Sequence, residues 1–137
     1  MGADFRHDLR EDGVSESEIN RLVNRSRIRI TSAPLVVIIC ADATEMDIYP
    51  DTKRKKAEYI MAMQSVANAS MQMLLAIHAE GLGAVWTCGP LFAPETVQIA
   101  LDLPETWEPQ SMFFVGYPDE MPRNKEMKSI ADLMVSR

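Results

Sequence analysis

The sequence predicts one domain, residues 1–137, in which helices combine with a small sheet, of the α/β or α+β class. An apolar run rich in β-branched residues at 33–41 (APLVVIICA) and a second at 111–117 (SMFFVGY) are typical of buried strands. Between them, the stretch from Glu58 to Glu80 encloses no charged residue and is long enough for a central helix. The expected order of helix, strand, long helix, strand, helix, strand and helix fits either class.

The N-terminal part is expected to hold a charged segment, 4–13, that ends at a turn, and then a helix at about 16–27. Ser15 and Glu18 have the spacing of a capping box, in which each residue satisfies a backbone N–H group of the other. The strand at 33–41 follows, and its continuous apolar character predicts burial on both faces.

The central helix is expected to open at Thr52, to continue through four basic residues (53–56) and to end near Gly81. Its two opposite sides are both largely apolar, so it needs burial in a core or against a partner chain. Apolar residues recur on one side at Ile60, Met63, Ala67, Met71, Leu74 and Ile77. The helix is long enough to span a membrane, but polar residues such as Gln64, Asn68 and Gln72 would be costly in hydrocarbon. We therefore expect a buried helix of a soluble protein and no membrane partner.

Shorter elements complete the chain. Residues 84–87 are expected to form a buried strand that ends at the turn Cys88-Gly89-Pro90. Pro94 fits the first position of a helix that runs to about Leu101. After the strand at 111–117 and a polar loop at 122–125, the spacing of apolar residues at 127–134 predicts a last amphipathic helix.

Composition and motifs exclude several functions. The net charge of −6 argues against a nucleic-acid partner. A polar N-terminus without a signal peptide and only two cysteines indicate a cytoplasmic protein without disulfides or a zinc site. The chain has no G-x-S-x-G motif and no Walker A loop, and Gly81-Leu82-Gly83 is only part of a dinucleotide fingerprint. The turn after residues 84–87 could present backbone groups to a flat ligand, although an ordinary strand end is the simpler interpretation.

The sequence nevertheless resembles the nitroreductase family of flavoproteins. The resemblance rests on the order of AEGLGAVWTCGP, APETVQIALDLPETWEPQ, MFFVGYP and PRNK, and extends back to FRHDLREDG and APLVVIICA. It is strongest to the nitroreductase-like domain associated with the γ-glutamyl ligase of coenzyme F-420 biosynthesis. It implies an α+β, nitroreductase-like fold and an FMN-dependent oxidoreductase that transfers hydride between a small-molecule electron donor and acceptor. It also implies a homodimer whose central helices pack across the interface.

The resemblance also implies a site, although it names no catalytic side chain because the flavin carries the reaction. Trp86, Thr87, Cys88 and Gly89 would lie along the isoalloxazine ring, Arg123 and Lys125 would hold the FMN phosphate, and Asp8 would contribute to substrate binding. Cys88 could instead act as a redox thiol, but a cysteine at the end of a buried strand is more often inert.

The chain departs from the family in one respect. The Arg-Arg-Ser type motif of the family's first helix, the main phosphate clamp, has no counterpart in residues 1–137. Two hypotheses follow. The chain is an FMN-dependent oxidoreductase with a deazaflavin precursor as its candidate substrate, or it is a non-catalytic dimeric module for ligand binding or assembly.

Overall fold

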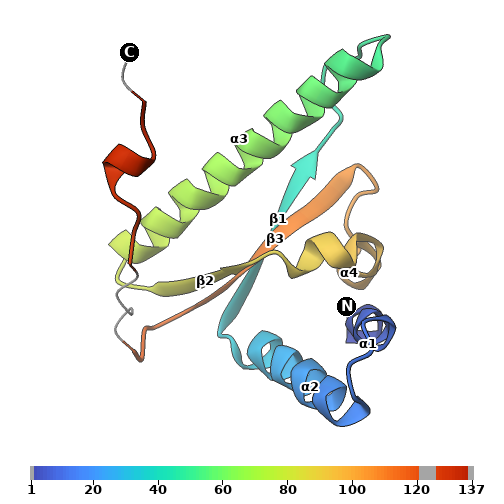
Figure 1. Ribbon diagram of the computed structural model, residues 1–137, viewed down its shortest axis with the longest axis vertical. Helices are drawn as coiled ribbons and strands as arrows, with labels where there is room; N and C mark the ends of the chain where they lie inside the picture. The colour runs from blue at the N-terminus through green and yellow to red at the C-terminus, as the bar shows by residue number, and fades with distance from the viewer. Residues whose placement is uncertain (1, 121–125, 136–137) are drawn as a thin grey trace.

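The computed structural model describes residues 2–120 and 126–135, and its centre is a three-stranded antiparallel sheet (Figure 1). The strands are β1 (Leu35–Asp42), β2 (Gly83–Thr87) and β3 (Trp107–Gly116), in the order β1-β3-β2. β3 is therefore the only strand of this sheet with a neighbour on each side. With helices packed around a small antiparallel sheet, the structure confirms the α+β class.

The strands differ from their predicted forms in length and burial. β3 begins at Trp107 rather than at 111, because pairing with the end of β1 extends it backwards. The pairing shifts register between Ile39 and Cys40, where Pro109 stands opposite Cys40. A proline has no N–H group for a regular ladder, and such an irregularity accommodates it. β1 is mostly half-buried, so the expected burial of that strand on both faces is wrong for the isolated chain.

Two helices pack against each other at one end of the molecule (Figure 1). The charged segment expected at 4–13 is helix α1 (Gly2–Glu11), and α2 (Glu16–Ser32) continues five residues beyond the predicted end at 27. The predicted cap is present, since the Glu18 N–H group donates to Ser15 Oγ at 3.4 Å. Arg10 forms an ion pair with Glu16 and so ties the two helices together.

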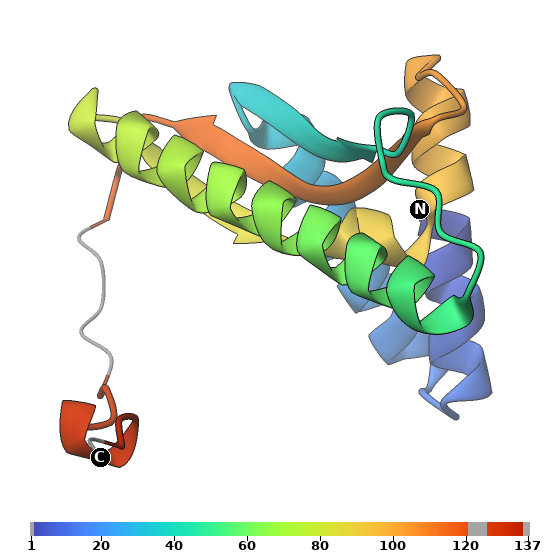
Figure 2. The ribbon, with the colours of Figure 1, turned by 90° about the horizontal axis from the view of Figure 1, so that it is seen from above.

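Helix α3 (Thr52–Ala79) crosses one side of the sheet and contacts β1 and β2 (Figure 2). It begins at Thr52 as predicted, and Gly81 follows its end in the left-handed conformation, with φ of +75°. Ser70 is its one buried residue, so the expected burial of this helix is not achieved within a single chain. By length and composition alone, α3 is also the one helix among the described residues that could cross a membrane.

The remaining elements pack near the centre of β3. A 3-10 helix η1 (Gly89–Phe92) leads into α4 (Pro94–Leu101), whose bounds agree with the prediction, and both contact β3. The small core combines residues of these elements with residues of α2 and the sheet. Its buried apolar side chains are Ile19, Ala41, Ala93, Val97, Met112, Phe113 and Val115.

The C-terminal segment, which we define as residues 126–135, lies apart from the rest of the molecule (Figure 2). The amphipathic helix expected at 127–134 is wrong, because the structure has only the 3-10 turn η2 (Ile130–Asp132) there. Ser129 caps this turn by accepting a hydrogen bond from the Asp132 N–H group. The apolar residues of the segment contact no core in this structure, which removes the main stabilisation of an amphipathic helix.

Candidate functional site

The four residues predicted to lie along a flavin ring follow one another from the end of β2 into η1. Trp86 and Thr87 are the last residues of β2, Cys88 stands at the turn, and Gly89 begins η1. The turn is closed by a hydrogen bond of 3.1 Å from the Leu91 N–H group to the Cys88 carbonyl oxygen. Cys88 directly follows the strand as expected, but the expected burial is wrong, because no residue of β2 is buried and Cys88 itself is exposed.

The Trp86 indole supports this turn from the protein side. Its ring meets the Phe113 ring edge-on, with centroids 5.6 Å apart, and the two residues face each other on β2 and β3. Trp86 Nε1 is buried and has no hydrogen-bond partner among the described residues. The contact of this ring with Phe113 joins β2 to β3 next to the turn.

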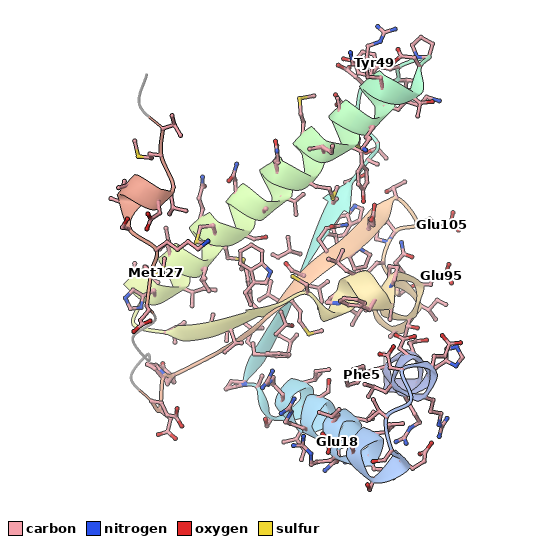
Figure 3. The ribbon with its side chains drawn as sticks, in the orientation of Figure 1. Phe5, Glu18, Tyr49, Glu95, Glu105 and Met127 are labelled. Atoms are coloured by element: carbon pink, nitrogen blue, oxygen red, sulfur yellow. The ribbon has the colours of Figure 1, made fainter. Side chains whose placement is uncertain are left out.

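A cavity of about 410 Å³ adjoins the turn, and we call it the Gly89 cavity. It lies where α1 meets η1 and α4 (Figure 3). Its volume falls within the range of small-molecule sites, roughly 300–1,000 Å³. The cavity brings Asp8 and Gly89 together, although they are far apart in the sequence. Its lining consists of Asp4, Phe5, Asp8, Leu9, Asp12, Ser26, Gly89, Phe92 and Ala93.

The lining separates into an apolar part and an acidic part. Phe5, Leu9 and Phe92 offer apolar surface, while Asp4, Asp8 and Asp12 recur at intervals of four along α1 and its end. Residues at this interval share one side of a helix. The Thr96 hydroxyl donates to Asp4 Oδ2 at 3.0 Å, and this bond joins α1 to α4.

The lining of the Gly89 cavity suits the isoalloxazine ring of FMN but not its phosphate. Aromatic walls and a glycine backbone fit the flat ring of a flavin. The described lining includes three carboxylates and neither lysine nor arginine, so it does not fit a phosphate dianion. The two residues predicted to hold that phosphate, Arg123 and Lys125, lie outside the described residues.

A second cavity, of about 920 Å³, was missed by sequence reasoning, and we call it the α3–β2 cavity. It is formed where the ends of α2 and α3 meet the ends of β2 and β3, including Leu75, His78, Val85 and Phe114. Arg29 and Glu120 supply opposite charges to its lining. No local motif marks it, because its walls come from four segments that only the fold brings together.

Neither a metal cluster nor the Cys40 thiol adds chemistry to the described part of the chain. In 2–120 and 126–135, no group of three or more His, Cys, Asp and Glu side chains could hold a metal ion. Burial raises the pKa of the Cys40 thiol, which keeps it protonated and poorly nucleophilic. The geometry thus defines an α+β protein with a mixed apolar and acidic cavity of small-molecule size at the end of its shortest strand.

Comparison with known proteins identifies the family. The model of the nitroreductase family matches residues 5–117, from α1 to the end of β3. The chain belongs to the nitroreductase family. The match includes both walls of the Gly89 cavity, apart from Asp4.

Individual relatives agree with this assignment. A protein of Methanothermobacter thermautotrophicus named "Putative NADH dehydrogenase/NAD(P)H nitroreductase" is 32% identical over 100 residues, which cover 72% of this chain and 47% of that protein. A protein of the same name from Bacteroides thetaiotaomicron has a solved structure with 26% identity and a TM-score of 0.58, covering 77% of this chain and 56% of that one. A BluB-like flavoprotein from Clostridium difficile has the same fold, with 16% identity and a TM-score of 0.63 over 98% of this chain and 70% of that one. The chain thus spans about half the length of the first two relatives.

Proposed function

We propose that this chain is part of an FMN-dependent oxidoreductase of the nitroreductase family. The observation that carries the proposal is the family match over residues 5–117, which includes both walls of the Gly89 cavity. The bound flavin would supply hydride transfer between a small-molecule donor and acceptor. The likeness to relatives named as NAD(P)H nitroreductases supports a nicotinamide donor.

The chain's own residues would bind and orient rather than react. The backbone of Cys88 and Gly89 would contact the polar edge of the ring, and the Trp86–Phe113 pair would hold that turn in place. Arg123 and Lys125 would hold the phosphate, which the acidic Gly89 cavity could not. Asp8 faces the same cavity as Gly89, and this supports its role in binding a substrate next to the ring. We extend the substrate proposal to a deazaflavin precursor on the sequence resemblance alone.

We further propose that the working form is a cytoplasmic homodimer through α3. Large apolar side chains such as Ile60, Met61 and Met71 are about half exposed on this helix in the single chain. Exposed apolar patches of this kind mark interfaces with proteins or membranes. Gln64, Asn68 and Gln72 are also exposed on α3, and a protein interface accommodates amide groups at a lower cost than hydrocarbon does.

An FMN titration of the purified full chain tests the cofactor, with flavin fluorescence or absorbance as the readout. We expect saturable binding, and we expect Arg123→Ala to weaken it by roughly tenfold or more, since a hydrogen bond to a charged group contributes about 1.5–3 kcal/mol. Lys128→Ala is the matched control, because it removes a nearby exposed cation that has no proposed role. Equal affinity of the Arg123→Ala variant and the wild type would remove Arg123 from the site.

One observation favours the alternative function, a non-catalytic dimeric module for ligand binding or assembly. The Gly89 cavity has three carboxylates in its lining and would repel the cofactor's phosphate. A chain that remains colourless at high FMN concentration and still elutes as a dimer would establish this alternative. A retained flavin that NAD(P)H reduces would exclude it.

A further inference from the structure

Two polar side-chain atoms are buried in the sheet without a hydrogen-bond partner among the described residues. They are Trp86 Nε1 on β2 and Ser111 Oγ on β3, and both atoms are closed off from solvent. Ser111 as a whole is only 2% exposed. A buried polar group without a partner lowers the stability of a fold, so most such groups bond to protein atoms or to internal water. These two atoms therefore need a partner of another kind.

The pairing of the strands places both side chains on the same face of the sheet. Trp86 pairs with Phe113, and residues directly opposite each other in a ladder share a face. The edge-on contact of the two rings, with 5.6 Å between their centroids, agrees with this arrangement. Ser111 precedes Phe113 by two residues on β3, and strand residues at that interval share a face as well. Trp86 and Ser111 are therefore diagonal neighbours across the β2–β3 ladder.

The spacing and the chemistry of this pair suit a small bridging molecule. Diagonal neighbours in a sheet lie about 7–8 Å apart, within reach of a large aromatic side chain. An indole N–H group only donates, whereas a hydroxyl group both donates and accepts. Phe113 and the residue that pairs with Ser111 on β1, Ile39, have apolar side chains and offer neither function. A water molecule, which also donates and accepts, would satisfy both atoms at once.

We propose that Trp86 Nε1 and Ser111 Oγ bind one internal water molecule between β2 and β3. The indole N–H group donates to the water oxygen, and the water donates to the Ser111 hydroxyl oxygen. The site lies at the end of the β2–β3 ladder, whose last pair is Thr87 and Met112. The bound water links the two strands next to the turn that begins at Cys88, whether or not the chain binds a flavin.

Water-selective NMR on the isotope-labelled full chain, without added flavin, tests the site. The chain has two tryptophans, so we expect two indole N–H signals. Trp107 is the internal reference, because its Nε1 donates directly to Asp42 Oδ2 at 3.1 Å. We expect a cross-peak between the Trp86 indole proton and water, with the sign of a long-lived bound molecule. Ser111→Ala should remove this cross-peak, because the water then loses one of its two partners.

Ser70→Ala is the matched control for this experiment. Ser70 is as deeply buried as Ser111, but its hydroxyl group already donates to the Val66 carbonyl oxygen at 2.8 Å. The cross-peak of Trp86 should therefore persist in Ser70→Ala. A Trp86 signal without a water cross-peak would overturn the proposal, and so would a cross-peak that persists in Ser111→Ala.

Thermal denaturation of the same chain provides a second readout. Ser111→Ala should lower the melting temperature, because it leaves the Trp86 bridge without its second partner. A higher melting temperature would show instead that the hydroxyl group is simply unsatisfied, and would overturn the proposal. Trp86→Phe combined with Ser111→Ala should lower the melting temperature by less than the sum of the two single losses, since both changes remove the same bridge. Additive losses would contradict a shared water.

Discussion

Three residues in the left-handed conformation end three of the helices in the same way. Gly13, Gly81 and Asp102 have φ values of +73°, +75° and +51° after α1, α3 and α4. The Gly81 N–H group donates to the His78 carbonyl oxygen, and the Leu82 N–H group donates to the Ile77 carbonyl oxygen. This pair of bonds is the Schellman motif, which satisfies carbonyl groups that a helix end leaves free.

The difference between glycine and aspartate at these positions gives a matched test. Gly81→Ala should lower the free energy of unfolding by about 1–2 kcal/mol, the cost of a left-handed conformation for a residue with a Cβ atom. Space is not the cause, because an added Cβ at Gly81 would meet nothing within 4 Å. Asp102→Gly should raise the melting temperature for the same reason. Chemical denaturation of both variants measures the two effects, and equal stability of Gly81→Ala and the wild type would contradict this explanation.

These residues also show what local sequence can predict. Gly81 was expected to end the central helix, because glycine directly after an apolar helical run is a strong signal. Asp102 gave no such signal, since aspartate adopts this conformation only occasionally. The contacts of Trp86 and Asp8 could not be predicted from local pattern, because each depends on a partner from a distant part of the fold.

At the scale of an element, the start of α3 explains an unusual sequence feature. Four basic residues in the first turn of a helix oppose its dipole. Asp51 offsets them, since its carboxylate accepts hydrogen bonds from the Arg54 N–H group at 3.0 Å and from the Arg54 guanidinium. The Arg54 guanidinium also lies over the Tyr49 ring, 5.1 Å from its centroid. Thr52 was correctly expected to begin the helix, but its cap was not identified.

This cap should make the stability of α3 depend on pH. The backbone N–H group and the guanidinium of Arg54 hold the pKa of Asp51 below its usual value. The stabilisation that the ionised Asp51 carboxylate contributes is therefore present above the unfolded pKa, about 3.9. It is lost as the pH falls through the lower pKa of the folded state. Asp51→Asn keeps a capping side chain without the titration, while Asp51→Ala loses both.

Thermal denaturation of these variants between pH 7 and pH 3 measures the effect. We expect the melting temperature of Asp51→Asn to be below that of the wild type at pH 7 and to approach it at low pH. Asp51→Ala should be less stable than Asp51→Asn throughout. Asp42, Glu16 and Glu18 also have lowered pKa values, and they titrate in the wild type and in both variants. Only the difference in melting temperature between wild type and variant therefore reports on Asp51. A constant difference between Asp51→Asn and the wild type would contradict the titration of Asp51.

For the whole molecule, the main departure from the sequence analysis concerns burial. Composition correctly predicted a long α3, but the single chain covers only one side of it, with Ser70 at the centre. Only three of the six residues on the predicted apolar side, Met63, Leu74 and Ile77, are even half-buried. Periodicity could not say which side meets the sheet, because apolar residues occur all round the helix.

The proposed dimer through α3 makes a direct prediction. Met71→Glu should convert the dimer into a monomer or an aggregate, because a carboxylate at the interface would be desolvated without a partner. Ile99→Glu is the control, since Ile99 is an exposed apolar residue of α4 that lies outside α3. Gel filtration with light scattering measures the mass. An unaltered dimer in Met71→Glu would place the interface elsewhere, and a monomeric wild type would refute the dimer itself.

The central position of β3 determines the order in which the chain can fold. β3 is the last strand in the sequence, yet both other strands pair only with it. Leu35 in β1 pairs with Val115, which lies 80 residues later in the sequence, so β1 cannot form its hydrogen bonds until that residue is present. During synthesis, no part of this sheet can form until residues 107–116 have left the ribosome, while α3 is already complete and largely apolar. Such long-range pairing slows folding and leaves apolar surface of the nascent chain open to aggregation until the sheet can close.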